Sequence, residues 1–262
     1  MRLKILFVCM VLGLLSSSAL AVGFLGPSTA GLNKGQWSIG YNYLYSDQDL
    51  DETKLKYMNS EGITDEGELS LENCKVQRHY GTLSYGVADW WEIYASVGVA
   101  DVKTEAEETY PGELYEYSLN FDNDIAWGWG TRITFLKGDK MSWGAAVQMN
   151  WLDISWDDKG ADWKDEVDID SYDIFVTVGP TFDMGGWKLY CGPFYYYLDG
   201  DIDYKYTETG YWSKTEGDIE ADANFGGYIG AQIPIAQNWD FTAEASMTGD
   251  GWGVGGGLVL KF

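Results

Sequence analysis

The sequence predicts an all-β chain folded as a transmembrane, antiparallel, up-and-down β-barrel. Two observations carry this prediction. Apolar residues recur at every second position in ten segments, which is the period of a strand with one apolar face. Short and long connections alternate between these segments, in a chain rich in glycine, tryptophan and tyrosine (33, 13 and 19 of 262 residues). Beyond residue 21, no segment is apolar enough for a membrane-spanning helix. Only helices and closed barrels can form all their backbone hydrogen bonds within lipid.

The N-terminal segment has the features of a secretory signal peptide. Arg2 and Lys4 precede an eleven-residue apolar run, and Ala19-Leu20-Ala21 matches a cleavage motif. We expect cleavage after Ala21, because the apolar run is too short to span a membrane as a helix. The predicted parts are therefore a signal peptide (1–21), an N-terminal linker (22–34) and a barrel domain (35–262).

The predicted strands follow one another in a regular up-and-down order. They cover residues 36–46, 74–86, 91–100, 124–135, 143–151, 171–178, 187–196, 224–233, 239–247 and 252–262. Ten strands are the prediction, with eight or twelve as alternatives, and an even number brings both termini to one side. Pro193 interrupts the seventh strand, where we expect a bulge or irregular pairing because proline lacks a ladder donor.

An apolar-face tryptophan opens every odd-numbered strand. These residues and the C-terminal aromatic residue are expected to form a membrane-interface girdle, since amphipathic rings collect at that depth. The girdle consists of Trp37, Trp91, Trp143, Trp187, Trp239 and Phe262.

The last eleven residues, Trp252 to Phe262, alternate apolar and glycine-rich faces and end in an aromatic residue. This strand resembles the closing strand of bacterial outer-membrane β-barrel proteins. The resemblance implies short periplasmic turns, long extracellular loops and contact with outer-membrane lipid and lipopolysaccharide. It also implies export to the outer membrane of a Gram-negative cell and recognition by the barrel-assembly machinery. No motif assigns a subfamily.

The chain is strongly acidic, with 41 acidic and 17 basic residues and a net charge of −24. This charge excludes a nucleic-acid partner, which requires a basic surface. Four long segments (46–74, 101–124, 153–170 and 199–222) hold 33 of the 41 carboxylates, and we expect them to form acidic extracellular loops. Asp199, Asp201 and Asp203 share one side of an extended chain, so these loops are candidates for loose binding of divalent cations. A solvated rim is the simpler interpretation.

Eight charged residues fall on the predicted inward faces, four of each sign. A charge facing lipid is costly, so we expect an internal ion-pair network and a narrow or blocked lumen. The predicted lumen network is Arg78, Glu92, Arg132, Asp173, Lys188, Asp240, Glu244 and Lys261.

The sequence offers no clear catalytic centre, metal site or cofactor site. The single histidine, His79, falls on the predicted lipid side, where a general base would not reach a substrate. Cys74 and Cys191 fall at opposite ends of different strands, which favours unpaired thiols. We therefore expect a structural or surface-exposed barrel, or a narrow pore, and not an enzyme. The alternative is an outer-membrane hydrolase with its active residues in the acidic loops.

Overall fold

The computed structural model describes residues 26–50, 53–110, 113–220 and 225–262. The predicted signal peptide, its cleavage site and residues 22–25 lie outside this part of the chain. Within it, no helix is long and apolar enough to cross a membrane. The strands are β1 (Trp37–Gln48), β2 (Thr53–Asn59), β3 (Thr64–Ala88), β4 (Trp91–Tyr110), β5 (Glu113–Lys137), β6 (Met141–Lys159), β7 (Trp163–Asp183), β8 (Lys188–Glu208), β9 (Tyr211–Glu220), β10 (Phe225–Ala236), β11 (Trp239–Met247) and β12 (Gly251–Lys261).

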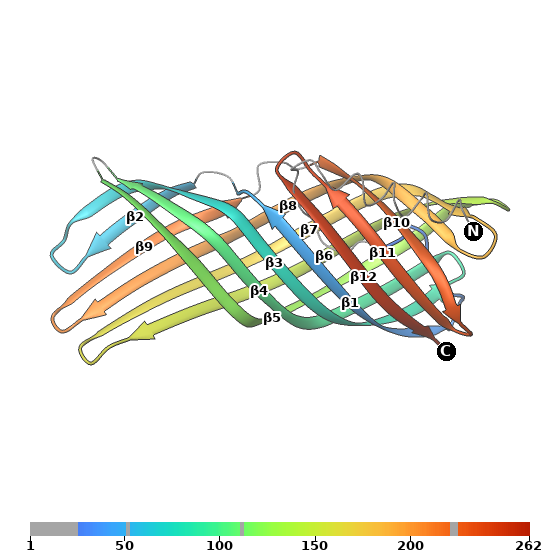
Figure 1. Cartoon of the computed structure of the whole chain (residues 1–262), viewed down its shortest axis with the longest axis horizontal. Coiled ribbons are helices and arrows are strands. Elements are labelled where there is room, and N and C mark those ends of the chain that lie inside the picture. Colours follow the sequence, from blue (N-terminus) through green and yellow to red (C-terminus); the bar gives the residue numbers. More distant parts are fainter. Residues whose placement is uncertain (1–25, 51–52, 111–112, 221–224) are drawn as a thin grey trace, which may run out of the picture.

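Ten of these strands close into a ring (Figure 1). Each pairs antiparallel with its neighbours, and β1 closes the circle by pairing with both β3 and β12. The N–H of Trp37 donates to the carbonyl of Phe262 at 3.0 Å, so the closing strand is held at its last residue. Short turns join the strands at the end where Phe262 lies, which we call the terminal end. The predicted up-and-down order and the short turns are confirmed, and the ring has the predicted ten strands, but the sheet has twelve strands in all, because β2 and β9 lie outside the ring.

The prediction of long acidic loops is wrong, because these segments are mostly paired strands. At the far end β3 to β8 continue beyond the ring, and β2 and β9 join them. We call this part the extension; it comprises residues 53–72, 102–121, 153–170 and 199–220, except 111–112. Its sheet order is β5-β4-β3-β2-β9-β8-β7-β6, because β2 pairs directly with β9.

Apolar residues at every second position explain why the acidic segments form strands. In β7, for example, Val167 and Ile169 are buried, whereas Asp168 and Asp170 point outward and are exposed. This alternation is the ordinary signal of a strand with one buried face. The high acidic content obscured it, because charged residues favour a loop when composition alone is considered.

Two bulges mark the boundary between the ring and the extension. Asn73 in β3 and Asn123 in β5 adopt positive φ angles of 51° and 62° where the pairing with β4 shifts register. The N–H of Asn73 is bound by Asp49 at 2.9 Å, and that of Asn123 by Asp101 at 2.7 Å. Each bulge adds one residue on one strand only and bends that strand. The inward positions therefore change from odd-numbered to even-numbered residues, for example from Leu71 to Cys74 in β3.

The irregular pairing expected at Pro193 is confirmed. The β7–β8 ladder runs to Thr177 opposite Phe194 and resumes at Thr181 opposite Tyr190. The register is the same on both sides of this interruption, which includes Pro180 of β7 as well as Pro193 of β8, so ladder bonds are lost there without a shift of the strands.

The ring and the extension place apolar residues on opposite faces. Outward side chains of the ring, including Ile39, Leu83, Val97, Ile125 and Trp129, are apolar and exposed. Inward side chains of the extension, including Leu55, Leu69, Phe121, Ile154 and Ile202, are apolar and buried. Each fully buried side chain of this size stabilises the fold by about 1.5–3 kcal/mol. The extension therefore has an apolar interior, which is continuous with buried aromatic residues inside the ring, whereas the ring also has an apolar exterior.

Candidate functional site

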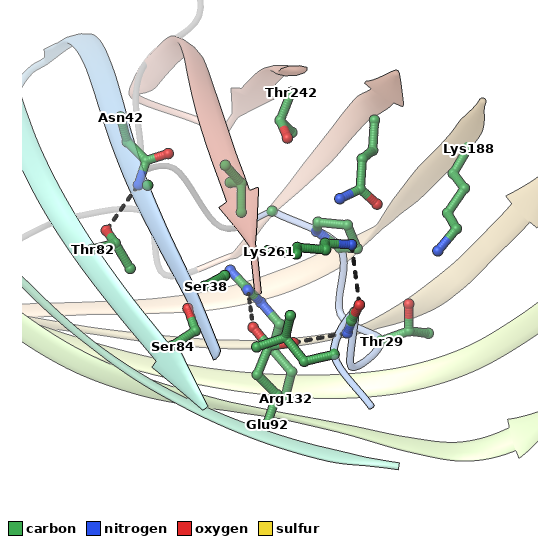
Figure 2. A pocket seen from close by; sticks show the side chains of 17 residues that line it. Thr29, Ser38, Asn42, Thr82, Ser84, Glu92, Arg132, Lys188, Thr242 and Lys261 are labelled. Carbon is green, nitrogen blue, oxygen red and sulfur yellow. Dashed lines mark hydrogen bonds and ion pairs between the residues drawn. The ribbon is translucent and has the colours of Figure 1, made fainter. Parts of the chain in front are cut away.

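The candidate site is the lumen of the ring, which Figure 2 shows at its terminal end. A cavity of about 70 Å³ lies there between Ser38 of β1, Ser84 of β3, Glu92 of β4 and Lys261 of β12. A second cavity of about 30 Å³ lies against Arg78 and Tyr80. Both are on the scale of one or a few water molecules.

Residues 26–33 fill the terminal end of the lumen from within. The N–H of Gly26 donates to Glu244 at 2.8 Å, and the N–H of Gly31 donates to Glu92 at 2.8 Å. Between them, the hydroxyl of Ser28 forms a hydrogen bond with the hydroxyl of Tyr228. This stretch belongs to the predicted N-terminal linker, and its burial was not predicted. A signal for it exists in the small residues of Gly26-Pro27-Ser28-Thr29-Ala30-Gly31, which fit a narrow lumen.

Further polar contacts hold this internal segment. The hydroxyls of Thr29 and Thr181 lie 2.9 Å apart, and the N–H of Ala30 donates to Thr134 at 3.0 Å. Ser28 and Thr29 are buried and cannot bond to water, so these hydrogen bonds give their hydroxyls the partners that they need.

Two ion pairs lie beside the internal segment. Arg132 Nη1 donates to Glu92 Oε1 at 3.0 Å, and the Lys261 ammonium lies 2.9 Å from the Asp240 carboxylate. Lys261 also donates to the carbonyl of Gly31 at 3.2 Å. Glu92 and Lys261 thus bind both the wall and the segment (Figure 2), which ties the strands at the terminal end to the chain inside.

A third ion pair crosses the lumen farther from the terminal end. Arg78 Nη1 donates to Asp173 Oδ2 at 2.9 Å, and both residues are buried. Asp173 also accepts from Asn150, whose carbonyl oxygen accepts from Gln148 at 3.0 Å. Buried ions are costly unless their remaining hydrogen-bonding groups are satisfied. Asn150 satisfies the second carboxylate oxygen of Asp173, whereas the buried Nε of Arg78 has no hydrogen-bond partner among the described residues.

The polar groups form one continuous network along the lumen. The hydroxyl of Tyr94 donates to Gln148 at 2.9 Å. The Arg132 guanidinium lies over the Tyr94 ring, 4.4 Å from its centroid. The Arg132–Glu92 pair is thereby linked through Tyr94, Gln148 and Asn150 to the Arg78–Asp173 pair.

Of the eight predicted lumen charges, the structure joins six into three pairs and holds a seventh by the internal segment. Glu244 accepts a hydrogen bond from the N–H of Gly26 in this segment. Lys188 is exposed at the mouth and has no ion pair among the described side chains.

Aromatic side chains fill the space that the charges leave. Tyr190, Phe194 and Phe175 are almost completely buried inside the ring. Gly230 and Gly226 lie opposite Tyr190 and Phe194, and a Cβ at either glycine would overlap the facing ring. The β-strand glycines are therefore the counterpart of the large inward rings.

The predicted girdle lies at the terminal end. Trp37, Trp91 and Trp239 are the first residues of β1, β4 and β11, and Trp143 and Trp187 lie near the starts of β6 and β8. Trp37, Trp239 and Phe262 are exposed. At the other end of the ring, Trp127 and Trp151 stack with their ring centroids 4.2 Å apart.

No group of three or more His, Cys, Asp or Glu side chains that could hold a metal ion forms in the part of the chain that the structure describes. His79 lies on the outward face, where its Nδ1 is 2.7 Å from the hydroxyl of Tyr41. Asp199, Asp201 and Asp203 point outward from β8, but no three His, Cys, Asp or Glu side chains converge on a common point. Cys74 and Cys191 are unpaired.

Comparison with known proteins gives structural neighbours only. No protein-family model and no curated protein matches the sequence. The solved structures that resemble it include the outer-membrane protein OprG from Pseudomonas aeruginosa, with 11% identity, a TM-score of 0.46, and coverage of 88% of this chain and 98% of that chain. The outer-membrane protease OmpT from Escherichia coli has 10% identity, a TM-score of 0.46, and coverage of 86% and 94%.

An outer-membrane channel from Pseudomonas putida F1 has 12% identity, a TM-score of 0.38, and coverage of 92% and 100%. These neighbours are bacterial outer-membrane proteins, the general class that the strand pattern resembles. At these identities they assign no subfamily and no activity.

Proposed function

We propose that the protein is an integral outer-membrane β-barrel that displays a structured, acidic extension at the cell surface and does not conduct. The observation that carries this proposal is the reversal of polarity along the strands. The outward face of the ring is apolar and exposed, as a lipid-facing band must be. The outward face of the extension is acidic, as a surface in water is.

The contents of the lumen support a structural role over that of a pore. A pore needs a continuous water-filled path, whereas residues 26–33, three ion pairs and the buried aromatic rings occupy this lumen. Beyond Arg78 and Asp173, the path would have to cross the apolar core of the extension. We include in the proposal that the protein is not an enzyme, since no observation favours the hydrolase alternative.

Two measurements test this proposal. The protein, once its folding has been verified by heat-modifiable migration on a gel, is expected to give no discrete conductance in a planar bilayer. Stepwise conductance would replace the structural role by that of a narrow pore. A mature protein that is freely soluble without detergent would contradict the membrane location itself.

Orientation is tested separately with epitope insertions at two turns. Ala161 lies in the β6–β7 turn of the extension, and Asp139 lies in the β5–β6 turn at the terminal end. Insertions at such turns are usually tolerated. Antibody is expected to label intact cells with the tag at Ala161 and only permeabilised cells with the tag at Asp139. The reverse pattern would invert the proposed orientation.

A further inference from the structure

The extension is open along one side, between β5 and β6. The β5–β6 ladder ends at Ala126 opposite Leu152, although β5 begins farther out, at Glu113, and β6 runs on to Lys159. In Figure 1 the β4–β5 and β6–β7 hairpins form opposite margins of the extension. The sheet therefore has two free edges in a molecule whose ring has none.

The outer part of β6 pairs on one side only. Residues 153–159 pair with residues 164–170 of β7, and no strand of the described chain pairs with their other side. In an antiparallel pair, alternate residues direct their N–H and C=O groups away from the partner. Residues 153–159 thus present a row of free backbone groups, which is a template for another strand.

The outward face of this edge is acidic and continues an acidic row. Asp153 lies opposite Asp170, which lies opposite Asp201, which lies opposite Asp218. Like charges directly opposite one another in a sheet are destabilising. Asp157 already lies 3.9 Å from the ammonium of Lys159, whereas Asp153 has no ion pair among the described side chains. A basic side chain placed next to Asp153 would therefore relieve the repulsion.

The inward face of the edge is apolar and incompletely covered. Ile154 is buried, but Trp156 remains 37% exposed although its cross-strand partner Val167 is buried. The difference arises because β7 covers Trp156 from one side and no neighbouring strand covers the other. An apolar side chain on an added strand would cover this ring.

We propose that the edge of β6 at residues 153–159 binds an extended segment of a partner protein in which basic and apolar residues alternate. The backbone of that segment would continue the sheet, its basic residues would face Asp153 and Asp157, and its apolar residues would pack on Ile154 and Trp156. A second copy of this chain is a poor occupant, because both of its free edges are acidic. Residues 113–124 of β5 contain no Lys or Arg, and residues 153–159 of β6 contain three Asp and one Lys. The proposal goes beyond the proposed function and does not depend on membrane insertion.

Peptide binding to the full mature protein, folded in detergent, tests the proposal. The probe is a short capped peptide of alternating lysine and valine, with binding measured by fluorescence anisotropy. The comparison peptide carries N-methyl groups on alternate amides, so it keeps the charge and the apolar side chains but lacks the pairing N–H groups. We expect it to bind about tenfold more weakly, because each lost backbone hydrogen bond weakens binding.

Matched substitutions locate the site. Ser155→Lys and Thr207→Lys each add one positive charge at an exposed, outward hydroxyl residue of the extension. Ser155 is on the free edge, whereas Thr207 of β8 is paired on both sides, with Lys164 and Trp212. S155K is expected to weaken binding of the lysine–valine peptide about tenfold and T207K less than about twofold.

Several outcomes would overturn the proposal. If the N-methylated peptide bound with equal affinity, backbone pairing would not contribute and the binding would be general surface electrostatics. Equal weakening by the two substitutions would lead to the same conclusion. Absence of binding to the wild-type protein at low salt would also overturn it. The peptide comparison uses only the wild-type protein, so it decides the matter even if S155K failed to fold.

Discussion

The ring and the extension are built from many of the same strands but have opposite cross-sections. In β5, Ile125 and Trp129 of the ring point outward and are apolar, whereas Phe121 of the extension points inward and is buried. The ring encloses ion pairs and polar hydrogen bonds together with aromatic side chains, whereas the interior of the extension is mainly apolar and holds no ion pair between buried residues of the described chain. In β5 the bulge at Asn123 shifts the two-residue period, so Phe121 points inward and Ile125 points outward. The proposed membrane location accounts for the difference in chemistry, because lipid favours an apolar outward face and water a charged one.

The core of the extension offers the largest expected effect. Phe121 is almost completely buried, and Phe121→Ala is expected to cost about 3–5 kcal/mol through lost burial and the cavity left behind. Limited proteolysis should then cleave the extension faster while the ring keeps its heat-modifiable migration. Simultaneous loss of both parts would show that they unfold as one unit.

A charge on the outward face distinguishes the two regions within one strand. Ile125→Arg, at a side chain that is 65% exposed in the ring, is expected to cost about 2–4 kcal/mol if that face contacts lipid. Leu114→Arg, at a side chain that is 56% exposed in the extension, is expected to change stability by less than about 0.5 kcal/mol. Urea titration of the two proteins folded in lipid vesicles measures both. Equal effects would remove the proposed lipid boundary between these positions.

Packing inside the ring is tested by adding a single carbon atom. Gly230→Ala would place its Cβ in the space of the Tyr190 ring, at an expected cost of about 1–3 kcal/mol. Gly81→Ala is the control, because its nearest neighbouring atom would be 3.7 Å away. Urea midpoints should fall for the first variant and stay near the wild-type value for the second; unchanged midpoints for both would contradict a tightly filled lumen.

The smallest expected effect is an alkaline loosening of the extension. Burial raises the pKa of Tyr204, and the hydrogen bond from its hydroxyl to Asp165 at 3.0 Å raises it further. The folded-state pKa therefore lies above the unfolded value of about 10, so Tyr204 stabilises the extension below about pH 10. This contribution is lost as the pH rises through the folded-state pKa.

Absorbance titration of tyrosinate measures this effect. Wild-type protein should show one more high-pH ionisation than Tyr204→Phe, together with a steeper loss of extension protection from proteolysis. An ionisation of Tyr204 near pH 10 would contradict the burial of its hydroxyl.

Local alternation in the sequence was sufficient to predict the ring. The ten strands, the short turns and the inward direction of residues such as Arg78 and Tyr190 follow from a period of two, which each strand carries without reference to its neighbours. The prediction was wrong where acidic composition was given more weight than the two-residue pattern. Residues 153–170, for example, were predicted as a loop, although Ile154, Val167 and Ile169 alternate with acidic residues.

Only the tertiary structure decided which groups meet. Arg78 and Asp173 are 95 residues apart, and Gly26 and Glu244 are 218 residues apart, so their pairing depends on the closure of the ring. The free edge of β6 likewise depends on where its ladder with β5 ends, at Ala126 opposite Leu152. A strand's own residues determine which of its faces points inward. Its partner across the lumen or along its edge is determined by the whole sheet, because such contacts join residues that are far apart in the sequence.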